Sequence, residues 1–296
     1  MSQSDFLHLL SDAAGKVDAT LQDILQGPDV AHAALASAMS YAALDGGKRL
    51  RAFLCLATAD IFSAPIGNAL RVASAIEAVH AYSLIHDDLP CMDDDDMRRG
   101  KPSLHKATDE ATAVLAGDGL LTLAFAILSD HATAPDAATR LSLVAGLAHA
   151  AGAAGMVAGQ AYDMDNDALK DAAMLLKIHS LKTGALIRFS VEAGALIAGA
   201  DDLARKQLIS YAENLGLAFQ IIDDVLDVTG EEEKIGKTTG KDQESDKLTF
   251  VSVYGVAGAK EHAARYATQA LEDIAIFGAR AEPLRQAVAF VIERES

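Results

Sequence analysis

The chain has 296 residues, 51% of them hydrophobic, which is enough to bury a large core within a single domain spanning residues 1–296. Its 42 acidic and 25 basic residues give a formal charge of −17, which argues against nucleic acid or an anionic membrane as the partner of the surface as a whole. The two cysteines imply no disulfide framework, and no secretory signal is visible, so we expect a cytoplasmic protein.

The composition predicts an all-helical fold. Ala and Leu dominate, only 6 prolines occur, and the alternation typical of strands is nearly absent. The longest uncharged run, residues 141–163, is long enough for a membrane span, but it is mostly Ala and Gly and carries His149 and Gln160. We interpret this run as a closely packed internal helix and therefore expect no membrane span.

A basic stretch, GGKRLR at residues 46–51, is the first candidate binding site along the chain. It supplies Lys48, Arg49 and Arg51, and its glycines, including Gly47, allow the backbone to approach a ligand closely. In a chain this acidic, cations beside glycine favour contacts to an anionic ligand such as phosphate.

The next predicted helix, residues 71–88, leads into the first of two acidic motifs. His80, Ser83 and Asp87 share one face of this otherwise apolar helix. The stretch HDDLPCMDDDDMRRGKP then places six aspartates within ten residues. Like charges this close repel one another, so the cluster predicts a bound counter-ion.

The residue types around this motif indicate a hard cation and a phosphate ligand. Carboxylates without cysteine or paired histidines select hard cations, and Mg²⁺ tends to bridge one or two carboxylates to substrate phosphates. Arg98 and Arg99 follow the aspartates directly, and HSLKTG further along offers Lys182 with Thr183 as additional donors.

The second acidic motif, FQIIDDVLD at residues 219–227, predicts an amphipathic helix with a carboxylate stripe. Gln220, Asp223, Asp224 and Asp227 recur at i, i+3, i+4 and i+7, so they lie within about 100° of arc on a helix. One such stripe alone is equally well explained as a solvated acidic face. Two of them on separate helices favour a metal site.

Two further patterns are misleading. GEEEKIGKTTG resembles a P-loop, but Gly230 and Gly236 enclose one residue too many and no strand precedes them. Residues 163–174 begin like a calcium loop, yet Ala168 stands where the turn requires Gly, so their aspartates are better explained by the start of the next helix. The long charged connection over 229–247 offers further cations, namely Lys237, Lys241 and Lys247.

Together these motifs resemble those of the trans-isoprenyl diphosphate synthase family, and the match is strongest to its bacterial farnesyl diphosphate synthases. The similarity rests on GGKRLR, DDLPCMD, RRGKP, KTG, FQ, DDVLD and GKTTGKD, which follow one another in this order over nearly the whole chain. It implies a single-domain bundle of about ten helices around a deep central cavity, usually as a homodimer. The implied reaction joins dimethylallyl or geranyl diphosphate to isopentenyl diphosphate.

The resemblance also implies roles for individual residues. About three Mg²⁺ ions, or Mn²⁺ in their place, would be held by Asp87, Asp88, Asp93, Asp223, Asp224 and Asp227. The allylic diphosphate would contact Arg98, Lys182 and Lys237, with Lys247 as a further substrate contact. Isopentenyl diphosphate would be held without metal by Gly47, Lys48, Arg51, His80 and Arg99. Thr183 and Gln220, with Lys182, would act at the reacting centre.

Product length in this family depends on residues just before the first motif. Tyr82 would lie about 7.5 Å from Asp87 along the helix axis and favours a C15 product, although Ser83 lies more squarely beneath Asp87. Two alternatives stay open, namely a C20 geranylgeranyl diphosphate synthase and a non-catalytic regulatory subunit of such an enzyme. The two intact aspartate motifs count against the regulatory subunit, and the lack of an NDxxSxxxE pattern counts against a terpene cyclase.

Overall fold

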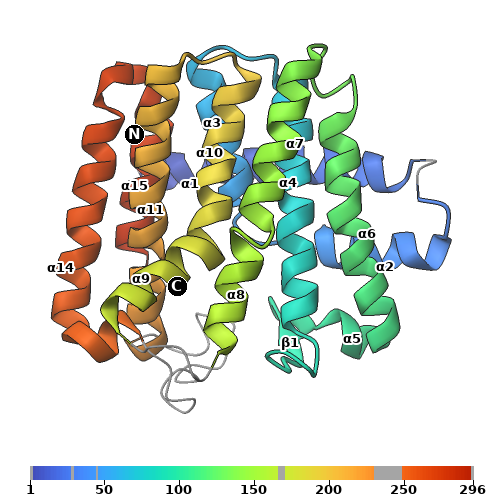
Figure 1. Cartoon of the computed structure of the whole chain (residues 1–296). Helices are drawn as coiled ribbons and strands as arrows, with labels where there is room; N and C mark the ends of the chain where they lie inside the picture. Colours follow the sequence, from blue (N-terminus) through green and yellow to red (C-terminus); the bar gives the residue numbers. More distant parts are fainter. Residues whose placement is uncertain (1–2, 28–29, 45, 166–170, 230–248, 295–296) are drawn as a thin grey trace.

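The predicted all-helical fold is confirmed by this computed structural model, which describes residues 3–27, 30–44, 46–165, 171–229 and 249–294 (Figure 1). The helices in chain order are α1 (Gln3–Leu25), α2 (Ala33–Ala43), α3 (Leu50–Ile61), α4 (Ile66–Asp87), α5 (Leu104–Ala107), α6 (Glu110–Ser129), α7 (Ala137–Ala151), α8 (Met156–Met164), α9 (Ala172–His179), α10 (Ala185–Ile197), α11 (Asp202–Thr229), α14 (Phe250–Asp273) and α15 (Glu282–Glu293). A π-helical turn, η1 (Ser180–Gly184), joins α9 to α10, and a 3₁₀ segment, η2 (Ala275–Ala281), precedes α15.

Helices α4 and α11 carry the two acidic motifs, and each packs against several other helices of the bundle. The buried residues of α4 are mostly Ala, Val and Ile, which lets α1, α3, α6 and α10 pack closely around it. Helix α11 packs against α10, α14 and α15. Both helices end at the lower edge of the molecule in Figure 1, so the two motifs lie at the same end of the bundle.

The stretch after the first motif forms a small hairpin, which the sequence indicated only as a break. Strands β1 (Met97–Arg98) and β2 (Lys101–Pro102) pair antiparallel. Arg99 and Gly100 between them both have positive φ, of 53° and 77°. Two consecutive residues with positive φ make the tight turn that matches the twist of paired strands.

The interpretation of residues 141–163 as one closely packed internal helix is wrong. The run forms two helices, α7 and α8, separated at Gly152–Gly155. A Cβ at Gly155 would lie 2.1 Å from the Ala150 carbonyl oxygen, so the close approach of the backbone at this break requires glycine. Only 33% of the most apolar window in Ala137–Met164 is buried.

Among the residues that the structure describes, two segments pass the length and composition test for a membrane span. They are α6, with a mean hydropathy of 1.9, and Ala137–Met164, with 1.6. Both pack against other helices of the bundle, α6 on α4 and α7 on α10. Core helices of soluble proteins meet the same test, so these segments are weak evidence for a membrane.

Aspartate N-caps explain part of the calcium-like stretch. The Asp171 carboxylate accepts the backbone N–H of Met174 and caps α9. Asp109 and Asp136 cap α6 and α7 in the same way. This position lets a carboxylate satisfy an otherwise unpaired N–H and favours the helix dipole.

Candidate active site

The first motif brings Asp87 and Asp93 together at the end of α4. The backbone N–H of Asp93 donates to the Asp87 carbonyl over 2.9 Å, so the chain folds back on the helix end. Burial raises the pKa of Asp87 to about 6, against the opposing effect of the nearby Lys182 ammonium, and the Asp93 charge raises it further. The charged form of the Asp87 carboxylate is therefore destabilised in this site, and a bound cation would stabilise it.

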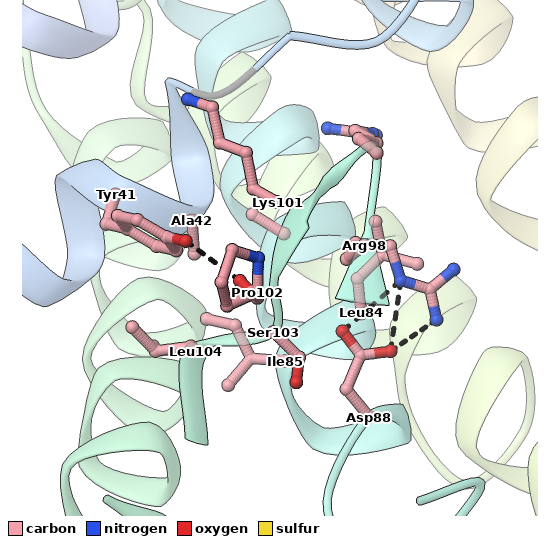
Figure 2. A pocket seen from close by; sticks show the side chains of 12 residues that line it. Tyr41, Ala42, Leu84, Ile85, Asp88, Arg98, Lys101, Pro102, Ser103 and Leu104 are labelled. Atoms are coloured by element: carbon pink, nitrogen blue, oxygen red, sulfur yellow. Dashed lines mark hydrogen bonds and ion pairs between the residues drawn. The ribbon is translucent and has the colours of Figure 1, made fainter. Parts of the chain in front are cut away.

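Asp88 has a different environment from Asp87, although the two are adjacent. It is buried, and the Arg98 guanidinium binds both of its oxygens, with Nε at 3.0 Å from one and 3.2 Å from the other (Figure 2). Arg98 also reaches Asp95 at 3.4 Å. The pairing of Asp88 with Arg98 fixes the hairpin against the end of α4.

His80, Arg51 and Arg99 form a second cluster, in which the two guanidinium groups carry the positive charge. Nη1 of Arg51 lies 3.3 Å from Nε2 of His80. Burial and then the charges of Arg51, Arg99, Arg49 and Arg98 hold the pKa of His80 well below its ordinary value. His80 is therefore neutral at pH 7 among guanidinium groups, which is an environment built for an anion.

Arg51 also has unused hydrogen-bonding capacity. Its Nε is buried and has no hydrogen-bond partner within the part of the chain that the structure describes. A buried guanidinium N–H without a partner is costly, so it points to a ligand that accepts there.

Gly47 and Arg99 fit together closely. Nη1 of Arg99 donates to the Gly46 carbonyl over 2.8 Å, and a Cβ at Gly47 would lie 2.7 Å from Cζ of Arg99. Gly47 has a φ of +90°, which side-chain-bearing residues rarely adopt. Glycine at this position lets the Arg99 side chain lie flat against the loop.

Lys48 extends from the same loop toward Phe290. Its ammonium lies 5.2 Å from the centre of the Phe290 ring, and burial followed by the Arg294 charge lowers its pKa. The Asp223 carboxylate acts in the opposite direction on the pKa of Lys48. The GGKRLR loop is therefore close to the second acidic motif.

Arg49 does not serve as a phosphate donor, contrary to the sequence-based interpretation. Its side chain is buried and donates to Glu77 over 3.0 Å, to Asp18, and to the Ala43 carbonyl. A second Glu77 oxygen accepts the backbone N–H of Ala52. Arg49 thus holds the loop between α2 and α3 against α1 and α4.

The three aspartates of the second motif lie in three environments on α11. Asp223 pairs with Arg294. Asp224 is buried and accepts the backbone N–H of Phe250 over 2.8 Å. Oδ2 of Asp227 is buried without a hydrogen-bond partner in the described part of the chain.

The KTG segment is presented by the π-helical turn η1. Nζ of Lys182 lies 2.6 Å from Asp163 of α8, and the Thr183 hydroxyl donates to Oε1 of Gln220 over 2.8 Å. These contacts connect α8 and α11 through η1. Such turns often occur at functional positions in helices.

Tyr82 and Ser83 are placed differently from one another on α4. Tyr82 is buried, and its ring meets the His86 ring edge-on at 5.7 Å between centres. Burial and the Asp87 charge raise the pKa of Tyr82, so the ring lies near the first motif. The Ser83 hydroxyl donates to the His80 carbonyl of its own helix over 2.9 Å.

The structure does not describe two of the predicted substrate contacts, and two residues that the sequence did not single out lie near the site. Lys237 and Lys247 lie outside the described residues. Arg294 and Asp163 reach the site without belonging to a recognisable motif. The only signal for Asp163 was its position in the calcium-like stretch, and the chain offered none for Arg294.

A pocket adjoins this site between α2, the end of α4 and the hairpin (Figure 2). Asp88, Arg98 and Arg99 contribute to its wall, whereas no residue of α11 does. Tyr41 closes one side, and its hydroxyl donates to the Pro102 carbonyl over 2.8 Å. The pocket therefore borders the first motif without including the second.

Comparisons with known proteins agree with this arrangement. Residues 32–278 match the polyprenyl synthetase family. The farnesyl diphosphate synthase of Geobacillus stearothermophilus is 47% identical over 267 residues, or 88% of each chain. The geranylgeranyl diphosphate synthase of Cyanophora paradoxa is 41% identical over 258 residues, covering 86% of both chains. The solved apo structure of an FPP/GFPP synthase from Zymomonas mobilis has a TM-score of 0.88 at 39% identity and covers 98% of this chain and 100% of that one. The chain belongs to the polyprenyl synthetase family.

Proposed function

We propose that the protein is a trans-prenyltransferase that condenses dimethylallyl or geranyl diphosphate with isopentenyl diphosphate and releases farnesyl diphosphate. Its farnesyl diphosphate synthase relatives, at 46% and 47% identity, support this function over that of geranylgeranyl diphosphate synthase, at 41%. One polyprenyl synthase domain over residues 1–296 carries the activity, and the site residues are those described above.

The observation that carries the proposal is the presence of two separate groups that could each bind a diphosphate, one through metal ions and the other directly. Asp87, Asp93, Asp223 and Asp227 supply carboxylates suited to a metal. The second group consists of the Arg51 and Arg99 guanidinium groups and the neutral His80 ring. Among the described residues, no aspartate of the motifs is hydrogen-bonded to any of these three. Two diphosphates of different fate therefore have different places to bind.

The carboxylates fit a hard divalent cation. Oδ2 of Asp227 is buried without a protein partner, and burial disfavours the charge on Asp87. We expect about three Mg²⁺ ions, with Mn²⁺ as a substitute, held by Asp87, Asp93, Asp223 and Asp227. Asp88 and Asp224 already bind Arg98 and the Phe250 N–H, so they orient the motifs as well. When bound, Mg²⁺ neutralises the charge that develops on the diphosphate leaving group.

The remaining residues bind, orient and separate the two substrates. Lys182 and Arg98 lie beside Asp87 and bind the allylic diphosphate as its C1–O bond breaks. Oε1 of Gln220 is oriented by the Thr183 hydroxyl, and both oxygens face the allylic cation that results. The double bond of isopentenyl diphosphate then attacks C1 of the allylic cation. The departed diphosphate accepts the proton that is released from C2 of the isopentenyl unit.

Isopentenyl diphosphate must keep its own C–O bond during this reaction. Lys48, Arg51 and Arg99 neutralise its diphosphate beside the neutral His80 ring, without polarising the bond as a metal cluster does. Replacing Arg51 or His80 with Gln is expected to raise KM for isopentenyl diphosphate at least about tenfold and to leave KM for geranyl diphosphate within about twofold. Equal effects on both substrates would contradict the assignment.

We also propose that the protein is a cytoplasmic homodimer that does not span a membrane. Val114 and Leu115 of α6 and Leu141 of α7 are exposed and apolar, and α6 is only 39% buried over its most apolar window. A second copy covering this face would bury it. Light scattering after size exclusion is expected to give twice the mass of 30.9 kDa, and replacing Leu115 and Leu141 with Glu is expected to give monomer.

A further inference from the structure

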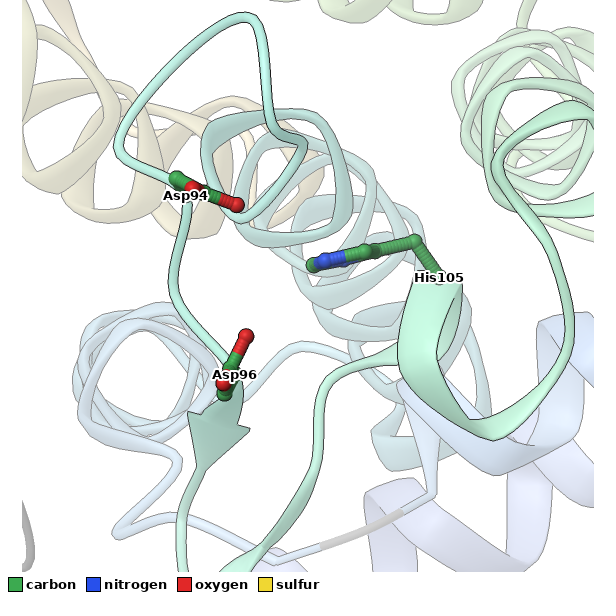
Figure 3. A group of neighbouring side chains, drawn as sticks. All are labelled: Asp94, Asp96 and His105. Carbon is green, nitrogen blue, oxygen red and sulfur yellow. The ribbon is translucent and has the colours of Figure 1, made fainter.

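A second group of potential metal ligands lies in the loop after the first motif. Asp94, Asp96 and His105 place one carboxylate or imidazole atom each within 4.8 Å of one another, and Figure 3 shows the three side chains converging on one space. Asp94 and Asp96 are exposed, whereas His105 on α5 is only 7% exposed.

The imidazole of His105 is oriented as a metal ligand would be. Its Nδ1 lies 3.2 Å from the hydroxyl of the buried Ser103. Its Nε2 is buried and has no hydrogen-bond partner among the described residues. In the tautomer with its proton on Nδ1, the ring donates to the serine hydroxyl and keeps the lone pair of Nε2 for a metal ion. Metal-binding histidines commonly have such a partner on the second ring nitrogen.

The loop group has a neighbouring cation of its own. Lys182 and Arg98 are the cations that act on Asp87, whereas Lys106 acts on the loop group and lies 2.8 Å from Oδ1 of Asp96. Asp94 and Glu110 also act on Lys106.

We propose that Asp94, Asp96 and His105 form a peripheral site for a borderline divalent metal ion of the Zn²⁺ class. One imidazole with two carboxylates suits Zn²⁺ or Co²⁺ better than Mg²⁺, which prefers oxygen ligands alone. Donors about 3.4 Å apart are needed around a tetrahedral Zn²⁺, so the two exposed aspartates must turn inward by about an ångström. Three protein ligands leave one position for water.

A metal ion at this site would fix the loop that carries the hairpin. The Ser103 backbone N–H donates to the Asp96 carbonyl over 2.9 Å, so the ligands lie at both ends of the β1–β2 segment. Binding would therefore close a short loop and restrict the backbone from which Arg98 and Arg99 extend. This consequence is independent of the proposed reaction.

The test is to treat the full chain with EDTA, remove the EDTA, and titrate the protein with Co²⁺ while Mg²⁺ is present in excess. The Mg²⁺ saturates the sites that prefer hard ions. We expect one equivalent of Co²⁺ with visible absorption and a paramagnetically shifted imidazole N–H signal, displaced by Zn²⁺. His105→Gln is expected to weaken Co²⁺ binding by at least about tenfold. Lys106→Met, which removes a competing cation, is expected to strengthen it roughly threefold.

Cys91→Ala is the matched control, because Cys91 is an exposed thiol on the same loop. Co²⁺ binding unchanged in Cys91→Ala supports the site, and its loss there would assign the ion to the thiolate. If His105→Gln fails to fold, the exposed pair Asp94→Asn and Asp96→Asn tests the same claim. A Co²⁺ equivalent that survives this double variant, or no Co²⁺ bound by the unaltered protein, overturns the proposal.

Discussion

Aspartates of the same acidic motif have different environments in this protein. Asp87 is held near Asp93 with a raised pKa, while Asp88 is neutralised by Arg98. On α11, Asp224 accepts a backbone N–H while Asp227 keeps an oxygen without a partner in the described residues. The chemistry of each carboxylate is therefore set by its neighbours and not by its place in a motif.

Replacing Asp87 with Asn is expected to stabilise the metal-free protein while reducing turnover by orders of magnitude. The folded-state pKa of about 6 exceeds the value in the unfolded chain, so folding loses stability as pH rises through this range and the loss is complete above it. In EDTA at pH 8 we expect Tm to rise by roughly 2–4 °C, with a smaller rise at pH 5.

Asp12→Asn is the control for this experiment, because Asp12 is an exposed member of a surface ion pair with Lys16. Its Tm should change little at either pH. A lower Tm for Asp87→Asn than for the unaltered protein at pH 8 would contradict the raised pKa.

Replacing Gly47 with Ala should disturb Arg99 specifically. The new Cβ would lie 2.7 Å from Cζ of Arg99, so the guanidinium must move. We expect KM for isopentenyl diphosphate to rise at least about tenfold. Gly46→Ala introduces similar backbone strain, at a φ of +84°, but its Cβ meets nothing within 4 Å. Equal KM values for the two variants would argue against the contact.

At the residue scale, the sequence predicted the kinds of groups better than their contacts. The charge pattern identified Lys48, Arg51, His80 and the acidic motifs as candidates for one site. It could not separate Arg49 from Arg51, because the partner of Arg49 is Glu77, 28 residues away in the chain. Burial of a cation depends on the tertiary position of its partner.

The elements that shape the site are short irregular segments between regular helices. The π-helical turn η1 lies against α8, where a Cβ at Gly159 would be 2.2 Å from the Lys182 backbone nitrogen. The hairpin holds Arg98 and Arg99 through a turn of two residues with positive φ. Helical periodicity predicted α4 and α11 because apolar residues recur along them, but it carries no signal for such segments.

Gly159→Ala is expected to displace η1 and lower kcat at least about tenfold, because a shift of about 1 Å in a reacting group can cost this much. Gly67→Ala on α4 is the control, since its Cβ meets nothing within 4 Å. That variant should keep full activity and gain up to about 1 kcal/mol of stability. Full kcat in Gly159→Ala would show that η1 does not position Lys182 and Thr183.

Tyr82 on α4 is expected to limit product length. Tyr82→Ala opens space beside the first motif, so we expect C20 or longer products from geranyl and isopentenyl diphosphate, measured by chromatography after dephosphorylation. Ser83→Ala is the control, because the Ser83 hydroxyl is bonded to its own helix. It should still give C15, and an unchanged product from Tyr82→Ala would defeat the assignment.

At the scale of the whole molecule, the fold brings together groups that are far apart in the chain. The GGKRLR loop precedes α3, the acidic motifs end α4 and α11, and Arg294 lies at the end of α15, yet the charge of Asp223 acts on both Lys48 and Arg51. Composition alone predicted the helical class. The resemblance implied that the two acidic motifs act together, and both lie at the same end of the bundle (Figure 1). The break between α7 and α8 required the structure.

The most direct test of the account is to incubate the purified protein with labelled isopentenyl diphosphate and geranyl diphosphate, with Mg²⁺ or with EDTA, and to size the dephosphorylated products. The account predicts a C15 product that depends on Mg²⁺. A C20 product would retain the chemistry but contradict the role of Tyr82. No product in Mg²⁺ would contradict the proposed function itself and favour a regulatory subunit.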